Sequence, residues 1–299
     1  MNWRPFVAAF SAALAFLAAV SIARTDQTVL YEKKSAYNTI VVTDEGNGVR
    51  ALRFGRAGVR QSAVKVGEPD VLVLPYVPVT LVGLALTAET RRFLVVGLGG
   101  GTLPMFLRKY YPDAAIDAVD IDPDVVDVAK RFFGFREDKF MSAHVADGQQ
   151  FIENSRQRYD VIFLDAFGSG SIPARLTTQE FLQAVRRVLA PGGVVVGNLW
   201  GREINPRYDS IVRTYEEVFG KLLVLDVRGT GNKILLGLSR KPPLAHDELI
   251  RRAREVSAAK RLPFDLGDLV QHGLPDTSPK VQRGRVLRDR DVEQHQRSP

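Results

Sequence analysis

The chain has 299 residues, 45% of them hydrophobic and 25% charged, which is enough to bury one sizeable core and a small second unit. It has no cysteine, which excludes disulfides, thiolate metal sites and a cysteine nucleophile. The net charge of +7 is spread along the chain without a basic run interleaved with aromatic residues, so nucleic acid is not an expected partner. The histidines lack metal-ligand spacing, and no metal site is expected (His144, His246, His272 and His295).

An uncharged apolar run occupies 6–23. Its length lies between that of a signal-peptide core and that of a short membrane span, so residues 1–25 are interpreted as a signal peptide or a membrane anchor. Because Arg24, Lys33 and Lys34 follow the run, the positive-inside tendency favours inner-membrane attachment with a cytoplasmic body. Export after signal cleavage is the alternative.

Residues 26–90 are expected to form a small unit with a β-hairpin and a linking helix. Two strand-like runs, 37–43 and 49–54, flank the turn-rich segment 44–48. The apolar segment 71–86 is predicted to be helical in its later part and to cover the edge of the next domain.

Residues 91–240 alternate between apolar strands and amphipathic helices. The expected strands are 93–96, 116–120, 141–146, 161–164 and 193–198, with helices at 103–110, 123–133, from 149, 178–189 and 206–219. This alternation predicts an α/β fold with a Rossmann-like, doubly wound, mostly parallel sheet. The runs 222–226 and 233–238 are expected to add an antiparallel edge. Residues 241–299 are predicted to hold a helix at 247–258 and a basic tail, mobile beyond Asp276.

A glycine-rich turn, Gly97, Gly99, Gly100 and Gly101, joins the first of these strands to its helix. Such a turn lets a ligand approach the backbone beside the positive end of the helix. Asp120 ends the next strand, 23 residues after Gly97, where a carboxylate can accept both hydroxyls of a ribose. A helix-capping acid is the structural alternative, and Asp122 is the better candidate for that cap.

Two further acids end the next two strands. Asp147, followed by Gly148, could accept a hydrogen bond from an adenine amino group, although Asp-Gly is also a common turn. Asp165 ends the strand YDVIFLD. Because open α/β sheets bind ligands at the carboxyl ends of their strands, these groups together predict a nucleotide site.

The segments VVGLGGG, AVDID, ADGQQFI and YDVIFLDAF follow one another with the order and spacing of the spermidine synthase (polyamine aminopropyltransferase) family. The upstream SAYNTIVV resembles the N-terminal hairpin segment of that family, and the resemblance spans 37–238. It implies a fold of the class I methyltransferase type and a co-substrate that is S-adenosylmethionine or its decarboxylated form. Spermidine synthases commonly dimerise, which by analogy suggests a homodimer.

Residue by residue, the resemblance implies that Asp120 with Ile121 holds the ribose and Asp147 with Gly148 holds adenine. It also places the 97–101 loop and Asn38 at the nucleoside. Asp165 would face the attacking amine. A carboxylate there could accept the proton as the nitrogen attacks and so serve as the catalytic group, and an N-cap or loop anchor is its structural alternative. Tyr76 and Phe167 would contact the acceptor substrate.

Two departures from the family pattern concern the substrates. The glycine loop has Gly100 where the family has an aspartate, and Gly168 replaces the second acid of its Asp-x-x-Asp pair. The loss of acids weakens attraction of a diamine and lets the glycine loop accept the carboxylate of intact S-adenosylmethionine. Three readings follow: aminopropyl transfer to an amine in polyamine biosynthesis, methyl transfer to an unidentified acceptor, or a membrane-anchored nucleoside-binding protein without catalysis.

Overall fold

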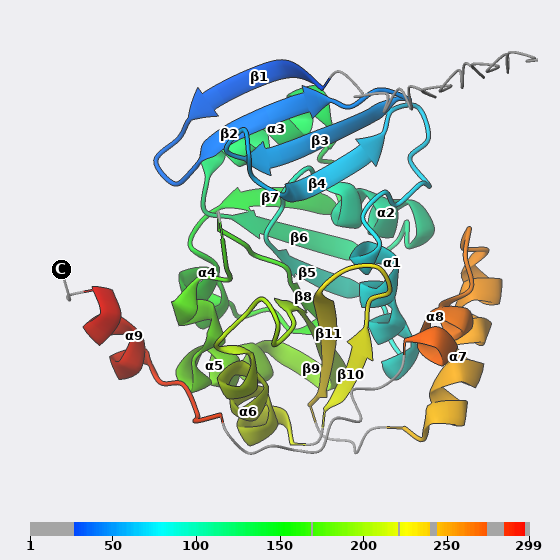
Figure 1. Cartoon of the computed structure of the whole chain (residues 1–299). Coiled ribbons are helices and arrows are strands. Elements are labelled where there is room, and N and C mark those ends of the chain that lie inside the picture. The colour runs from blue at the N-terminus through cyan, green and yellow to red at the C-terminus, as the bar shows by residue number, and fades with distance from the viewer. Residues whose placement is uncertain (1–26, 169, 221, 240–243, 274–283, 297–299) are drawn as a thin grey trace, which may run out of the picture.

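The structure is a computed structural model and describes residues 27–168, 170–220, 222–239, 244–273 and 284–296. Within these residues, a four-stranded antiparallel sheet lies above a seven-stranded, mostly parallel sheet (Figure 1). The strand order is β1-β2-β3-β4 in the small sheet and β10-β11-β9-β8-β5-β6-β7 in the large sheet. The predicted α/β, doubly wound class is confirmed.

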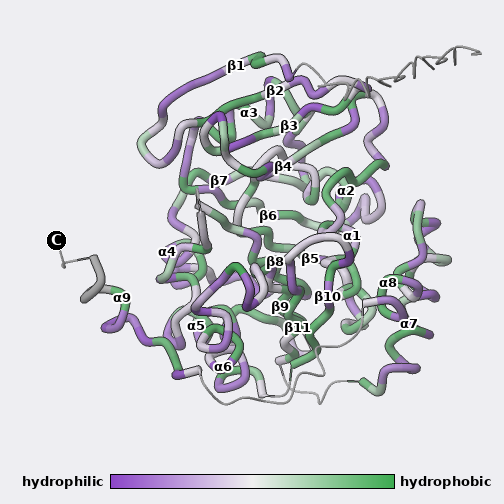
Figure 2. Tube along the Cα trace, in the orientation of Figure 1, coloured by the Kyte–Doolittle hydropathy of each residue, from purple (hydrophilic) through white to green (hydrophobic). Residues whose placement is uncertain are grey.

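In the large sheet, the central strands are buried on both faces. Its parallel strands are β5 (Arg92–Val96), β6 (Ala115–Asp120), β7 (Met141–Val145), β8 (Tyr159–Leu164) and β9 (Leu189–Trp200). The predicted antiparallel edge is formed by β10 (Leu223–Asp226) and β11 (Asn232–Leu238). Figure 2 shows the hydrophobic colouring concentrated on these central strands, as continuous burial requires.

Helices cover both faces of this sheet. One apolar cluster joins it to η1 (Leu81–Leu86), α2 (Thr102–Tyr110), α7 (His246–Lys260) and α8 (Leu266–His272). A second cluster joins the opposite face to α4 (Gly148–Asn154), α5 (Gln179–Val188) and α6 (Tyr208–Phe219). The shorter helices are α1 (Tyr76–Thr80) and η2 (Ala174–Thr177).

The predicted hairpin is the centre of the small sheet, formed by β2 (Thr39–Asp44) and β3 (Val49–Phe54). Positive φ angles at Gly46, Asn47 and Gly48 make the tight connection between them. The outer strands, β1 (Thr28–Lys34) and β4 (Arg60–Lys65), extend the hairpin on its two sides.

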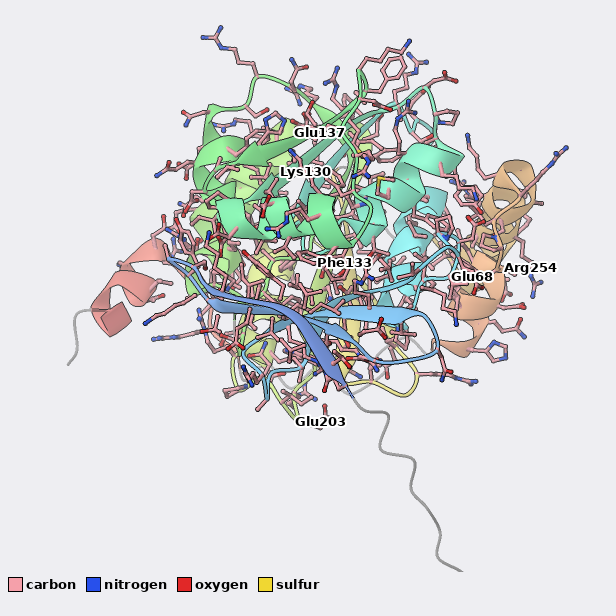
Figure 3. The ribbon with its side chains drawn as sticks, turned by 90° about the horizontal axis from the view of Figure 1, so that it is seen from above. Glu68, Lys130, Phe133, Glu137, Glu203 and Arg254 are labelled. Carbon is pink, nitrogen blue, oxygen red and sulfur yellow. The ribbon has the colours of Figure 1, made fainter. Side chains whose placement is uncertain are left out.

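Helix α3 (Pro123–Phe132) connects the two sheets. Its apolar face packs against the small sheet through Val125 and Val128, which contact the cluster containing Ile40 and Leu52. Figure 3, seen from above, shows Phe133 between α3 and the small sheet. Thus α3 fixes the position of the small sheet over one edge of the large sheet.

The predictions for the two chain ends can be compared with the structure only over the described residues. The apolar run at 6–23 lies outside the described residues. No described helix is both long and apolar enough to cross a membrane. Of the tail predicted to be mobile, 284–296 are described: Leu287 is buried, its N–H donates to Thr214, and α9 (Asp289–Gln296) follows. The burial of Leu287 and its hydrogen bond to Thr214 tie the segment to α6.

Candidate functional site

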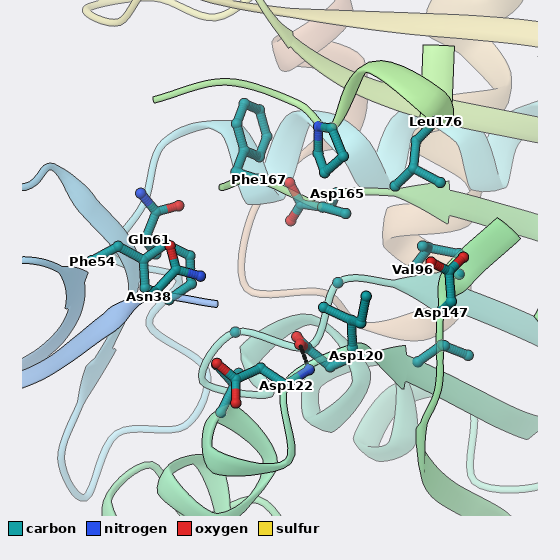
Figure 4. A pocket seen from close by; sticks show the side chains of 18 of the residues that line it. Asn38, Phe54, Gln61, Val96, Asp120, Asp122, Asp147, Asp165, Phe167 and Leu176 are labelled. Carbon is teal, nitrogen blue, oxygen red and sulfur yellow. Dashed lines mark hydrogen bonds between the residues drawn. The ribbon is translucent and has the colours of Figure 1, made fainter. Parts of the chain in front are cut away.

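A pocket opens at the carboxyl ends of the parallel strands and is walled on one side by the small sheet (Figure 4). It brings together ten of the residues predicted for the site: Asn38, Tyr76, Gly97, Gly99, Asp120, Ile121, Asp147, Gly148, Asp165 and Phe167. Gly100 and Gly101 are not among the described residues that line it. A smaller chamber shares Tyr76 and Asp165 with the pocket and extends towards Ser62 and Thr102.

The glycine turn brings the end of β5 against the end of β8. Gly97 has φ +98°, and a Cβ there would collide with the backbone of Asp165. Its N–H donates to the carbonyl of Val119 on β6 at 2.8 Å. A residue with a side chain would therefore be strained in φ and would push β8 away from β5.

Asp120 is held by the backbone that surrounds the glycine turn. One of its oxygens accepts from the N–H of Leu98 at 2.9 Å, and the other accepts from the N–H of Asp122 at 3.0 Å. Burial raises the pKa of Asp120, and these backbone donors oppose the rise. Each oxygen keeps a lone pair with which it can accept a hydroxyl hydrogen. The helix cap is supplied by Asp122, which accepts from the N–H of Asp124, as predicted.

Asp147 has two partners in the structure. Its Oδ1 caps α4 by accepting from the N–H groups of Gln149 and Gln150, and its Oδ2 pairs with Arg175 at 2.9 Å. The cap is a local role that the Asp-Gly pair allowed, while Arg175 comes from η2, which also lines the pocket. An adenine amino group can reach this carboxylate only by sharing Oδ2 with Arg175 or displacing it.

Asp165 lies at the inner wall, between the pocket and the chamber. The Tyr76 hydroxyl donates to its Oδ2 at 3.0 Å, and the Asn198 amide donates to its Oδ1 at 2.8 Å. Burial raises the pKa of Asp165 to about 6, although both hydrogen bonds lower it. Burial also raises the pKa of Tyr76, so that its hydroxyl stays a donor at neutral pH. The carboxylate is ionised above pH 6 and placed to accept a proton.

Sequence reasoning missed several residues of the site because they are uncharged or come from distant elements. Asn198 interrupts the apolar strand β9, a signal that could have marked it, and Asn232 on β11 donates to it at 2.9 Å. Gln61 of β4 and Arg175 of η2 line the pocket without any recognisable spacing. The rings of Phe167 and Trp200 meet edge to face, with centroids 6.1 Å apart.

The space that a side chain at Gly100 would need is filled. A Cβ there would lie 2.8 Å from the ring of Phe133 and 2.8 Å from the hydroxyl of Ser62. Phe133 is only 8% exposed, so it cannot move aside cheaply. At Gly168, by contrast, the nearest atom would be the carbonyl oxygen of Ser171 at 3.5 Å, an ordinary contact.

Comparison with known proteins relates the chain to one family. The family described as spermine/spermidine synthase domain matches residues 78–203. A polyamine aminopropyltransferase of Vibrio vulnificus is 32% identical over 271 residues, which cover 88% of this chain and 88% of that protein.

Solved structures are also similar to this chain. The structure of human methyltransferase-like protein 13 in complex with SAH is 34% identical, with a TM-score of 0.57 over 64% of this chain and 94% of that chain. A probable spermidine synthase of Corynebacterium glutamicum, 19% identical, shares the fold with a TM-score of 0.67 over 87% and 96% of the two chains. Given the match to the Vibrio enzyme over most of both sequences, the chain belongs to the polyamine aminopropyltransferase (spermidine synthase) family.

Proposed function

We propose that the protein transfers an aminopropyl group from decarboxylated S-adenosylmethionine to the nitrogen of an amine. The observation that carries the proposal is the buried carboxylate of Asp165, held by Tyr76 and Asn198 beside the pocket that contains Asp120 and Asp147. Family membership supports it, since the matching relative is named for aminopropyl transfer.

In this reaction the amine lone pair attacks the propyl carbon bonded to the sulfonium. The new C–N bond forms as the C–S bond breaks, and the electron pair of the broken bond leaves with sulfur as a neutral thioether, 5′-methylthioadenosine. The nitrogen gives up a proton, which Asp165 accepts. The protein supplies alignment and a base, because the positive sulfur already makes the carbon electrophilic.

Titration calorimetry with decarboxylated and intact S-adenosylmethionine, followed by turnover with a panel of amines, tests the proposal. We expect the decarboxylated form to bind and to yield 5′-methylthioadenosine with an alkylated amine. Binding of the intact form alone, followed by methyl transfer, would contradict it. Binding of either form without turnover would favour a nucleoside-binding protein that has lost catalysis.

Methyl transfer is the second candidate because a side chain has no room at Gly100. With Phe133 and Ser62 against this position, the glycine turn presents no carboxylate that would repel the carboxylate of intact S-adenosylmethionine. Similarity to the human methyltransferase-like protein supports the same reading.

Two matched substitutions separate steric from electrostatic effects of the missing acids. Gly100→Asp is expected to destabilise the protein by about 1–3 kcal/mol, because its Cβ collides with buried Phe133. Gly168→Asp, with no such collision, is expected to change stability by less than about 0.5 kcal/mol and to strengthen diamine binding. Urea unfolding and calorimetry with 1,4-diaminobutane check both. Equal stability losses in the two variants would contradict the packing argument.

We further propose that the apolar run at 6–23 anchors the enzyme in the inner membrane, with its body in the cytoplasm. The cations that follow the run, Arg24, Lys33 and Lys34, support this orientation. A protease-protection assay on spheroplasts, in which the outer face of the inner membrane is accessible, is expected to leave the body uncut. Digestion of the body from outside the inner membrane would contradict the proposal.

A further inference from the structure

Two buried asparagines extend from Asp165 into the antiparallel edge of the large sheet. Asn198 on β9 is 2% exposed, and Asn232 on β11 is 5% exposed. The Asn232 amide nitrogen donates to the Asn198 oxygen at 2.9 Å, and the Asn198 amide nitrogen donates to Asp165 at 2.8 Å. Of the two, only Asn198 touches the carboxylate.

The directions of these hydrogen bonds are fixed by chemistry at the Asp165 end. An ionised carboxylate can only accept, so Asn198 must turn its NH₂ group towards Asp165. The Asn198 oxygen then faces Asn232, which must offer its own NH₂ group. A change at Asn232 therefore bears on which end of the Asn198 amide meets the carboxylate.

We propose that Asn232 is a positioning residue, which holds the Asn198 amide so that it donates to Asp165 and keeps that carboxylate ionised. The inference rests on the proposed role of Asp165 as the base. Without Asn232, the Asn198 amide can rotate and present its oxygen, which favours the protonated form of Asp165. Asn232 thereby acts on the reaction through a residue that it contacts and not through the substrate.

Other charged and titratable groups also lie around Asp165, and a substitution at Asn232 leaves them unchanged. Tyr76 of α1 donates directly to the carboxylate, and Lys233, next to Asn232, is paired with Asp226 at 2.6 Å. The remaining charged groups that line the pocket come from β6, α3, α4 and η2: Asp120, Asp122, Asp147 and Arg175. None of these side chains is hydrogen-bonded to Asn232 within the described residues.

Carbon-13 NMR titration of the aspartate carboxyl carbons tests the proposal, with the Asp165 signal identified by its loss in Asp165→Asn. In Asn232→Leu the titration midpoint of Asp165 is expected to rise by about one pH unit, since a hydrogen bond to the charged form is lost. Asn232→Ser, which leaves room for water, is expected to shift the midpoint in the same direction by less. Thr214→Val is the matched control, because it removes the buried hydrogen bond that the Thr214 hydroxyl of α6 accepts from the Leu287 N–H, away from the site.

The acid limb of the rate profile is expected to move with the NMR midpoint. An unchanged midpoint in both Asn232 variants, with any loss of rate equal at every pH, would overturn the positioning role and show a merely structural one. If Asn232→Leu does not fold, Asn232→Ser decides. The NMR midpoint needs no turnover, so an absence of aminopropyl transfer would defeat the proposed function while this result still decides the role of Asn232.

Discussion

Asp165→Asn is expected to reduce amine alkylation by about 10²- to 10⁴-fold, because asparagine cannot accept the proton that the nitrogen releases. Binding of the sulfonium nucleoside should stay within a few-fold of the unchanged protein. Rapid-quench measurement of 5′-methylthioadenosine formation at saturating nucleoside checks this, with calorimetry for the binding. In the unchanged protein the rate should rise with pH through about 6, where Asp165 loses its proton.

Asp165→Asn is also expected to stabilise the folded protein above pH 7. The pKa of Asp165 is raised to about 6 by burial, so the folded state holds the proton more tightly than the unfolded chain does. Stability of the unchanged protein therefore falls as pH rises from about 4 to about 6. Asp165→Asn removes this loss and should raise the free energy of unfolding by up to about 3 kcal/mol above pH 7. Urea unfolding at pH 4 and pH 8 measures it, and a variant that is less stable at pH 8 would contradict the burial argument.

Asp120→Asn should weaken nucleoside binding by about 10²- to 10³-fold. Its carboxylate accepts from the Leu98 and Asp122 N–H groups and has lone pairs left for two hydroxyls, whereas an asparagine amide turns one donor towards them. Calorimetry with S-adenosylmethionine and its decarboxylated form measures the loss.

Asp117→Asn is the control for this substitution. Asp117 lies on the same strand but binds His144 and Tyr159 away from the pocket, so its replacement should leave nucleoside affinity unchanged. If Asp120→Asn and Asp165→Asn weakened nucleoside binding equally, the two acids would not have the separate roles assigned to them.

Much of the fold was predictable because a strand that is buried on both faces has a continuous apolar sequence. Apolar runs such as 93–96 can only be covered on both faces, and the helices between them carry one apolar stripe each. The outer strands β1 and β4 were missed because their sequences lack such an apolar pattern. β1 is almost wholly exposed, and β4 reads RQSAVK, so neither shows an apolar alternation. Both owe their conformation to pairing with β2 and β3.

The site was predictable where position along a strand determines position in space. Parallel strands bring their carboxyl ends to one edge, and this places Asp120, Asp147 and Asp165 around one pocket. Contacts between distant segments carry no such rule. Arg175 reaches Asp147 from a 3₁₀ turn, and Asn232 reaches Asp165 only through Asn198. These partners depend on tertiary packing that no spacing in the sequence describes.

A crystal structure of the complex with 5′-methylthioadenosine would test the central arrangement most directly. We expect the ribose hydroxyls within hydrogen-bond distance of Asp120, adenine beside Asp147, and the thioether sulfur turned towards Asp165. A nucleoside bound elsewhere, or one whose sulfur points away from Asp165, would contradict the account.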